Sequence, residues 1–217
     1  MMQWEGITTM PNNAQCKTFI KIIAPIIQRE AYARGYTTPS AIIAQACLES
    51  RYGYSGLAKY HNYFGLKCGS AWRGASVNMQ TKEEYTPGIK TAIKSNFRVY
   101  ANITEGVKGY FDFINTKRYA ALKTAKTPAE YLTKIKNAGY ATSSTYVPDL
   151  MAVVRKWDLY VYDIEPTADN TEADIKEQVA KRVINGEFGN GEERKARLMA
   201  AGFDPSEIQK VVNKLLS

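Results

Sequence analysis

Residues 39–53 read Pro39-Ser-Ala-Ile-Ile-Ala-Gln-Ala-Cys-Leu-Glu49-Ser50-Arg-Tyr-Gly53. The apolar residues of this stretch recur at helical spacing, which predicts a buried helix over residues 39–50. Its buried stripe consists of Ile42, Ile43, Ala46 and Cys47. Glu49 lies seven residues after the first of these and three after Ala46, so it projects from the same apolar face. A carboxylate there is costly unless it is paired or protonated, and burial raises its pKa.

Two interpretations of Glu49 fit this spacing. A carboxyl group whose pKa is raised by burial can act as a general acid near neutral pH. Alternatively, Glu49 pairs with one of the many Lys or Arg residues and only closes the helix. The spacing alone does not decide between them.

The rest of the first 163 residues is also mainly helical in pattern. Helices are predicted near residues 14–34, 39–50, 105–116, 128–138 and 148–158. Capping hydroxyls mark three of the starts, at Thr38, Thr104 and Thr127. Between residues 76 and 100 the apolar period changes to two, and Thr86-Pro87-Gly88 supplies a turn. We therefore expect an exposed β-hairpin set into a helical domain.

The chain changes character after the apolar run that ends at Tyr162. Residues 164–172 are polar and contain Pro166, which predicts a linker between a large domain, residues 1–163, and a small one, residues 173–217. Three short helical patterns follow, near residues 172–184, 191–201 and 204–216. The expected fold class is mainly α (α+β): a helical domain with a small β-hairpin lobe, then a three-helix bundle.

The net charge of +8 is uneven along the chain. Residues 1–163 carry 21 Lys and Arg against 11 Asp and Glu, whereas residues 164–217 carry 8 against 10. A cationic surface speeds encounter with nucleic acid, an anionic membrane or an anionic wall polymer, and does not choose among them. The sequence has no recognised nucleic-acid-binding motif, so no nucleic-acid partner is expected.

No run of the sequence approaches the roughly 18 apolar residues that a membrane-spanning helix needs. Residues 1–11 lack the basic-then-apolar plan of a secretory signal. We therefore expect synthesis in the cytoplasm without a signal peptide, and no membrane insertion.

Thiol and metal chemistry have little support. Cys16, Cys47 and Cys68 show neither a disulfide framework nor the spacing of a zinc site. The single histidine, His61, leaves Cys47 or Cys68 with His61 as the thiol dyad to consider, and Cys47 lies on the apolar stripe. We expect no metal and no cofactor.

A second pair of carboxylates, Glu83 and Glu84, lies in the predicted hairpin, about 35 residues after Glu49. Hydrolysis of a glycosidic bond requires two carboxylates facing a cleft, since one protonates the leaving oxygen and the other activates water or stabilises the transition state. The alternative is a charged hairpin tip. Among the 15 tyrosines, Tyr140 and Tyr146 are candidates for stacking on sugar rings.

Five motifs occur in order along residues 14–163. They are Ala44-Gln-Ala-Cys-Leu-Glu49-Ser50-Arg-Tyr-Gly53, Asn62-Tyr-Phe-Gly65-Leu-Lys67, Thr81-Lys-Glu-Glu-Tyr85-Thr-Pro-Gly88, Phe97-Arg-Val-Tyr100, and Ala138-Gly-Tyr140-Ala-Thr142 with Tyr146. In this order they resemble glycoside hydrolase family 73, the glucosaminidases of bacterial autolysins, flagellar wall hydrolases and phage endolysins. The resemblance implies a lysozyme-like fold and cleavage of the β-1,4 bond between N-acetylglucosamine and N-acetylmuramic acid in peptidoglycan, leading to cell lysis.

The same resemblance implies roles for particular residues. Glu49 is the general acid, and Tyr140 lines the cleft. The expected substrate-binding residues are Asn62, Phe64, Gly65 and Tyr146. The family usually shows Thr-x-Glu-Tyr, whereas this chain has one more residue, so either Glu83 or Glu84 is the second carboxylate. Glu84 is preferred because the turn from Tyr85 to Gly88 then stays in register, while strand alternation places Glu83 on the opposite face.

Residues 173–217 resemble the short wall-binding repeat called CW-seven. The similar residues are Val183-Ile-Asn-Gly186-Glu-Phe-Gly189-Asn-Gly191-Glu-Glu-Arg194 and Ala201-Gly-Phe-Asp204. The resemblance implies binding of peptidoglycan fragments through the turn Gly189, Asn190, Gly191 and through Arg194, whose guanidinium suits a carboxylate. A single copy is expected to bind weakly, so an oligomer would add avidity. A repeat of this kind suggests a Gram-positive target.

Alternative functions stay open. Glu49-Ser50 also resembles the signature of lytic transglycosylases, so a transglycosylase or muramidase acting on the same glycan is the second hypothesis. The third is a non-catalytic basic adaptor that binds wall or nucleic acid. The separation of the carboxylates, which the sequence does not give, decides between retaining and inverting chemistry, and the substrate's acetamido group is a further nucleophile. A wall hydrolase made in the cytoplasm would act after release, through a holin or at lysis.

Overall fold

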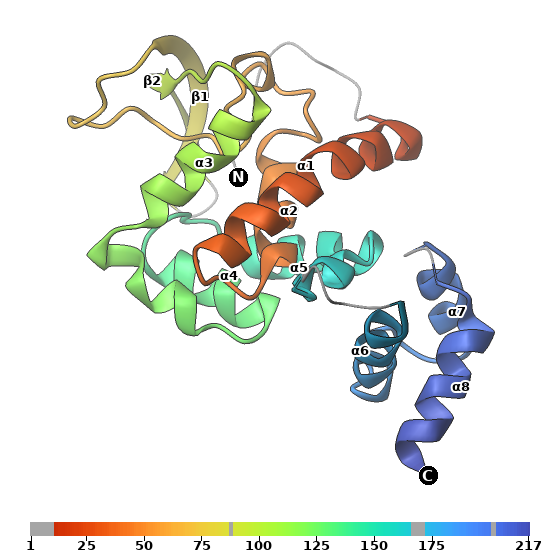
Figure 1. Cartoon of the computed structure of the whole chain (residues 1–217). Helices are drawn as coiled ribbons and strands as arrows, with labels where there is room; N and C mark the ends of the chain where they lie inside the picture. Colours follow the sequence, from red (N-terminus) through yellow and green to blue (C-terminus); the bar gives the residue numbers. More distant parts are fainter. Residues whose placement is uncertain (1–10, 87–88, 166–171, 201–202) are drawn as a thin grey trace.

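The computed structural model describes residues 11–86, 89–165, 172–200 and 203–217. These residues are mainly helical, with one two-stranded antiparallel sheet (Figure 1). The helices before the C-terminal group are α1 (Asn13–Ala33), α2 (Pro39–Glu49), α3 (Ile103–Ile114), α4 (Pro128–Asn137) and α5 (Tyr146–Lys156), with the 3₁₀ helices η1 (Ala58–Tyr60), η2 (Lys117–Thr124) and η3 (Leu159–Asp163). The predicted fold class, mainly α with a small β-hairpin lobe, is confirmed. The 3₁₀ helices were not predicted.

Helix α2 lies at the centre of this part of the molecule. Residues 39–47 are all buried, so the helix has no solvent-facing stripe. It packs against α1, α4, α5 and η3, and the main hydrophobic core is built around it. A helix that is apolar on every side is stable only when other elements surround it. Its C-terminal end brings Glu49 to the edge of the core.

The starts of the helices agree with the sequence in one case and differ in two. Thr127 caps α4 through its hydroxyl, as predicted. Thr104 does not cap α3, because the helix begins earlier and the side chain of Asn102 caps it. Thr38 does not cap α2 either, since its hydroxyl is buried without a hydrogen-bond partner.

The predicted hairpin consists of β1 (Ser76–Thr86) and β2 (Ile89–Arg98). The strands pair from Ser76 with Arg98 to Glu84 with Lys90, and a bulge follows Glu84. Figure 1 shows the hairpin at one end of the helical body, close to α3. Phe97 anchors its base, because the ring is fully buried and the residue forms a bridge to Lys67.

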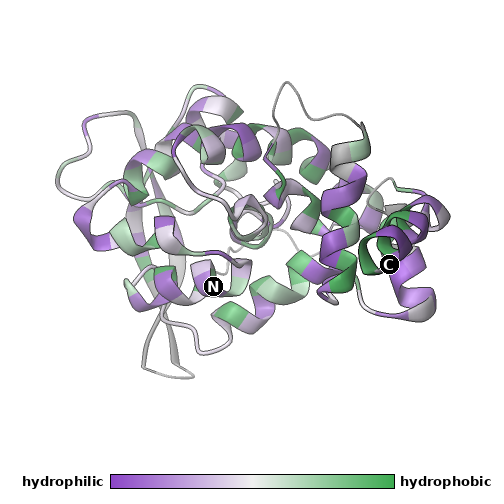
Figure 2. Cartoon of the chain, turned by 60° about the horizontal axis from the view of Figure 1, so that its bottom comes forward, coloured by the Kyte–Doolittle hydropathy of each residue, from purple (hydrophilic) through white to green (hydrophobic). Residues whose placement is uncertain are grey.

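The C-terminal helices α6 (Glu172–Ile184), α7 (Gly191–Ala200) and α8 (Pro205–Leu216) form a separate group (Figure 1). In Figure 2, hydrophobic (green) and hydrophilic (purple) residues alternate along the helices beside the C-terminus. They share a second core made of Ile164, Val179, Ala180, Val183, Phe188, Leu198, Ile208 and Val212. Ile164, predicted to begin the linker, therefore packs with the C-terminal helices. Residues 166–171 of that linker lie outside the described part of the chain.

Gly106 marks the closest approach of α3 to the loop that precedes the hairpin. A Cβ at this position would lie 2.0 Å from the carbonyl oxygen of His61, far inside van der Waals contact. Because that oxygen belongs to the backbone, Gly106→Ala is expected to lower the free energy of unfolding by about 1–3 kcal/mol. Urea unfolding measures the change.

Lys108→Ala is the matched control on the same helix, since the Lys108 side chain is 41% exposed. Its effect is expected to stay within about 0.5 kcal/mol. A Gly106→Ala loss no larger than that of the control would contradict the close contact.

Candidate active site

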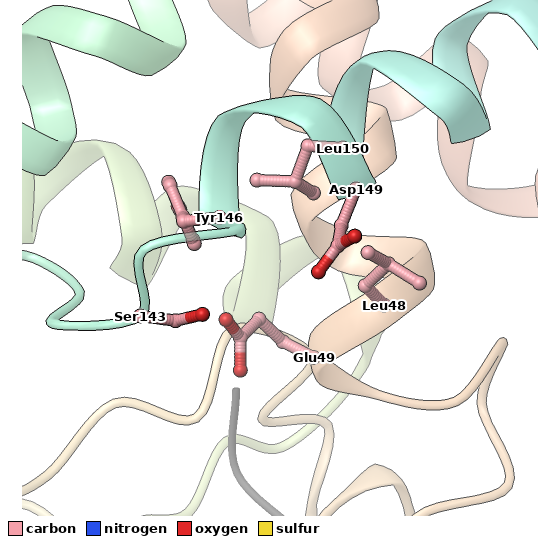
Figure 3. Close-up of a pocket in the computed structure, with 6 residues that line it drawn as sticks. All are labelled: Leu48, Glu49, Ser143, Tyr146, Asp149 and Leu150. Atoms are coloured by element: carbon pink, nitrogen blue, oxygen red, sulfur yellow. The ribbon is translucent and has the colours of Figure 1, made fainter. Parts of the chain in front are cut away.

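Glu49 is the last residue of α2 and is only 8% exposed. It lines a small pocket together with Leu48, Ser143, Tyr146, Asp149 and Leu150. In Figure 3 the carboxylate of Glu49 and the hydroxyl of Ser143 point toward one another, and Asp149 approaches from the first turn of α5. The pocket is therefore built where the end of α2 meets the start of α5.

The backbone directly after Glu49 turns through three left-handed residues. The φ angles are 50° at Arg51, 54° at Tyr52 and 83° at Gly53. Left-handed conformations cost roughly 1–2 kcal/mol for a residue with a side chain, so the rest of the fold has to hold this turn. The hydroxyl of Ser50 does so by donating to the carbonyl of Ala46 at 2.6 Å and accepting from the backbone N–H of Gly53 at 2.9 Å. Ser50 thereby fixes the end of the helix that presents Glu49.

A buried hydrogen-bond network lies one turn below Glu49. Gln45 donates to the hydroxyl of Tyr146 at 2.8 Å and accepts from the hydroxyl of Tyr110 at 2.7 Å. The Tyr110 hydroxyl is also 2.7 Å from that of Tyr131. These four side chains join α2, α3, α4 and α5, and each buried polar group has a partner. The network fixes Tyr146 against α2.

Tyr146 was predicted to bind substrate, and the structure places it on the wall of the Glu49 pocket. Burial, and then the negative charge of Glu49, raise the pKa of the Tyr146 hydroxyl well above its ordinary value. The phenol therefore stays protonated at any physiological pH. Because it accepts its hydrogen bond from Gln45, its own proton remains available for donation at the pocket.

Tyr140, predicted to line the cleft, lies beside Tyr146 with ring centroids 6.4 Å apart. Its hydroxyl donates to the carbonyl of Phe64 at 2.9 Å. Burial and the charge of Glu49 raise the pKa of Tyr140 as well. Tyr140 thus connects the neighbourhood of Glu49 to the loop at residues 62–66, and its proton is used within the protein.

The other predicted substrate residues belong to that loop and serve its internal structure. Asn62 is 1% exposed, and its amide bonds to both backbone groups of Leu66 and to the carbonyl of Arg98. The ring of Phe64 is buried and stacks on Tyr110, with centroids 4.1 Å apart. Gly65 has a φ of 65°, which suits glycine. The side chains of Asn62 and Phe64 are buried, and the prediction that Asn62, Phe64 and Gly65 bind substrate stays a prediction.

Glu83 and Glu84 both lie in β1, where they pair with Thr91 and Lys90. The side chains of residues 81–92 are outside the part of the structure that is described. The choice of second carboxylate between these two residues therefore stays a prediction.

Sequence reasoning missed Ser143 and Asp149, which share the pocket with Glu49. Asp149 is partly exposed and sits in the first turn of α5. The available signal was its spacing, because Asp149 and Leu150 follow Tyr146 by three and four residues and so share its helix face. Asp149 is a carboxylate of the described chain that lies beside Glu49.

An aromatic row extends from the pocket toward the base of the hairpin. The ring of Phe113 lies 6.1 Å from that of Tyr140. The guanidinium of Arg98 lies 5.4 Å from the Phe113 ring and 4.7 Å from the Trp72 ring. These three side chains are partly exposed, which gives the row both aromatic surface and one positive charge.

The predicted wall-binding turn is present in the C-terminal group. Gly189 and Gly191 have φ angles of 74° and 56°, so this turn requires glycines. Arg194 donates to the carbonyl of Gly189 at 3.2 Å and to the side chains of Asn190 at 3.1 Å and Gln209 at 3.3 Å. Arg194 therefore shapes the turn and ties it to α8, and its role toward a ligand carboxylate stays a prediction.

The structure gives no support to a catalytic pair of a cysteine thiol and His61. Cys47 is fully buried, and burial raises the pKa of its thiol well above the ordinary value. The Nδ1 atom of His61 lies 3.0 Å from the hydroxyl of Tyr63. Within the described ranges, no three His, Cys, Asp or Glu residues are grouped to hold a metal ion. The same part of the chain contains no helix long and apolar enough to cross a membrane.

A buried carboxyl group that opens on a pocket, in a helical body with a small β-lobe, is an arrangement that a glycoside hydrolase can use. A family model described as mannosyl-glycoprotein endo-β-N-acetylglucosaminidase, the glucosaminidase family, matches residues 24–159. The chain belongs to this glucosaminidase family. A second model, the CW_7 repeat, matches residues 177–216.

Known relatives agree with this membership. The chain is 32% identical over 193 residues to exo-glucosaminidase LytG of Bacillus subtilis, covering 84% of this chain and 67% of that protein. It is 30% identical over 154 residues to peptidoglycan hydrolase FlgJ of Pseudomonas aeruginosa, covering 68% of this chain and 38% of that protein. A crystal structure of a peptidoglycan hydrolase mutant from Sphingomonas sp. A1 superposes with a TM-score of 0.59 at 25% identity, covering 67% of this chain and 97% of that one. The chain thus spans about two thirds of one curated relative and well under half of the other.

Tyr146→Phe tests the network below Glu49. The change removes one hydroxyl and leaves the buried amide of Gln45 without its acceptor, so the free energy of unfolding is expected to fall by about 1–3 kcal/mol. If the Tyr146 proton assists at the pocket, kcat on a glycan substrate falls about 10-fold with little change in KM. Tyr119→Phe is the matched control, because Tyr119 is buried and contacts Phe113 but does not line the Glu49 pocket. Equal kcat in Tyr146→Phe and the control would exclude an active-site role for this hydroxyl.

Proposed function

We propose that this protein cleaves the β-1,4 bond on the reducing side of N-acetylglucosamine in bacterial peptidoglycan, with Glu49 as the general acid, and that this cleavage lyses the cell. The observation that carries the proposal is the position of Glu49, buried at the end of the central helix and open to the pocket beside Tyr146. Membership of the glucosaminidase family supports the reaction class. The names of the relatives, an exo-glucosaminidase and a peptidoglycan hydrolase, support the substrate.

The proposed reaction begins with a protonated Glu49. As the glycosidic bond breaks, Glu49 donates this proton to the leaving oxygen and positive charge develops on the sugar ring. Neutral phenols such as Tyr146 provide polar surface there without adding a charge that would compete for the proton.

The charge on the sugar ring has to be met from the opposite side. The candidates are Glu84, Glu83, Asp149 and the acetamido group of the substrate itself. Asp149 is supported by its place in the pocket, and the hairpin glutamates by the family motif. A second carboxylate would act as nucleophile or base according to its distance from Glu49.

Glu49→Gln tests the acid. Glutamine keeps the size of the side chain but has no acidic proton to transfer, so kcat is expected to fall at least 100-fold while the free energy of unfolding changes by less than about 1 kcal/mol. Turbidity loss of purified walls measures the activity. Glu105→Gln on the exposed surface of α3 is the matched control and is expected to keep full activity.

The products identify the bond. Digests reduced with borohydride and analysed by mass spectrometry are expected to carry reduced N-acetylglucosamine ends. Only muramitol ends would make the protein a muramidase, and anhydro-muropeptides would make it a lytic transglycosylase. Undiminished wall lysis by Glu49→Gln would show that Glu49 is not the acid, and digests of the wild type without any new glycan ends would leave only a non-catalytic role.

A comparison of Glu83→Gln, Glu84→Gln and Asp149→Asn tests the second carboxylate. The residue that stabilises the sugar cation is expected to lower kcat about 100-fold or more when neutralised, and the other two by less than about 5-fold. Azide added to the most impaired variant probes for a nucleophile, because a small anion can replace a missing carboxylate. Near-normal activity in all three variants would assign the role to the acetamido group.

The C-terminal CW_7 repeat supports a second part of the proposal, that the protein is held on the wall while it acts. We propose that the chain reaches the wall from the cytoplasm at lysis. A wall pull-down compares the full chain with its Arg194→Gln and Lys195→Gln variants. Weaker binding of Arg194→Gln alone would indicate a ligand contact at the turn, whereas equal weakening of both would indicate a general charge effect.

A further inference from the structure

The N-terminus of α2 is capped from a distant part of the chain. Asp163, at the end of η3, accepts from the backbone N–H of Ser40 at 2.7 Å and from its hydroxyl at 2.6 Å. Thr38, the residue at the N-cap position, makes no such bond. A carboxylate at this end also complements the positive end of the helix dipole. Asp163 therefore performs the capping function for the helix that ends at Glu49.

This carboxylate sits in an environment that opposes its charge. Burial raises the pKa of Asp163 to about 7, although the two Ser40 hydrogen bonds and the charge of Arg182 act in the opposite direction. The Asp163 and Arg182 side chains are both 13% exposed, and Nη2 of Arg182 lies 4.0 Å from Oδ2 of Asp163. Near neutral pH, the neighbouring Arg182 guanidinium therefore favours the ionised form of Asp163.

Arg182 comes from α6, within the residues that match the CW_7 repeat. Its Nε donates to Glu187 at 2.8 Å, and its guanidinium lies 5.1 Å from the centre of the Tyr160 ring. On the other side, Gln28 of α1 donates to the carbonyls of Tyr162 and Ile164 at 3.0 and 2.9 Å. The repeat and the central helix are thus joined by a short chain of contacts through η3.

We infer that Asp163 and Arg182 are positioning residues that couple the C-terminal repeat to the active site: Arg182 of the repeat balances the charge of Asp163, and Asp163 anchors the helix that presents Glu49. This inference rests on the proposed role of Glu49 as the acid. It assigns to the repeat a part in setting catalytic geometry, in addition to any part in holding the enzyme on the wall.

The groups that face Asp163 come from several elements. Tyr32 projects from α1, Ser40 from α2, and Tyr160 belongs to η3 itself. Arg182 and Glu187 come from the repeat, and Glu165 also acts on Tyr32. Among the described residues, Arg182 is the cation with a resolved contact to the Asp163 carboxylate.

The sign of the pH dependence follows from the raised pKa. An Asp with an unfolded pKa of about 3.9 and a folded pKa of about 7 binds its proton more tightly in the folded protein, so its ionisation lowers stability as the pH rises through this window. Arg182 offsets this loss only where Asp163 is charged. Removal of Arg182 should therefore cost more at pH 8 than at pH 5, because the loss of its contacts with Glu187 and Tyr160 is common to both pH values.

Thermal unfolding of the full chain tests this directly, with Arg182→Gln, Asp163→Asn and the double variant. The Tm loss caused by Arg182→Gln is expected to be roughly 3–6 °C larger at pH 8 than at pH 5. On an Asp163→Asn background, which keeps an oxygen to accept from Ser40 but has no charge, the Arg182→Gln loss is expected to be the same at both pH values. Lys181→Gln is the matched control, because the neighbouring Lys181 pairs only with Glu177 in the contacts resolved and is 59% exposed.

Kinetics on soluble glycan strands provide a readout that a merely structural contact would not move. At pH 8, Arg182→Gln is expected to lower kcat about 3- to 10-fold relative to Lys181→Gln with KM unchanged, and at pH 5 the ratio returns to about 1. The double variant is expected to recover most of this kcat. A repeat that serves only in binding would instead raise KM or lower wall binding.

An equal Tm loss at both pH values, simple additivity with Asp163→Asn, or an unchanged kcat at pH 8 would each overturn the coupling. The circular dichroism spectrum of every variant at 25 °C shows whether it is folded before these comparisons are made. The Glu49→Gln variant distinguishes a failure of the proposed function from a failure of the coupling. Activity that survives in Glu49→Gln defeats the proposed function, whereas an inactive Glu49→Gln together with an unchanged Arg182→Gln defeats only the coupling.

Discussion

The burial of α2 on all sides is the constraint on which the rest of this structure depends. A helix without a polar face requires neighbours around its whole circumference, and α1, α4, α5 and η3 fill that role. Its two ends are then the places where charge can approach the core. Asp163 occupies one end from outside the helix, and Glu49 occupies the other from within it. The same burial that stabilises the fold sets the electrostatic environment of both carboxyl groups.

The polar groups around the centre of α2 are neutral. Gln45 and the hydroxyls of Tyr110, Tyr131 and Tyr146 satisfy one another across four helices. Burial raises the pKa of each of these phenols, so none of them becomes charged near the pH at which a carboxylic acid acts. A neutral network of this kind fixes the side chains near Glu49 without adding a positive charge. A lysine or arginine in the same place would favour the ionised form of the carboxyl group.

The sequence predicted what depends on periodicity and missed what depends on distant contacts. The apolar stripe of α2, the hairpin and the three C-terminal helices follow from local patterns, and all are present. Thr38 has the local signature of a cap but does not act as one, because the cap is supplied by Asp163, which lies 123 residues after Ser40 in the chain. Asn62 and Phe64 carry the family motif, yet their side chains hold the loop together from inside. A motif records that a residue is needed and does not say whether its side chain faces the substrate or the core.

The position of Asp163 also bears on how two modules can share one reaction. A close-packed core transmits displacement because its side chains have little free volume in which to absorb it. Helix α2 is 11 residues long and buried along its length, so a shift at Ser40 reaches Glu49 as a movement of the whole helix. The left-handed turn after Glu49, held by Ser50, prevents the C-terminal end from adjusting independently. A contact from the repeat at one end of this helix is therefore felt at the acid on the other end, although the two sites have no residue in common.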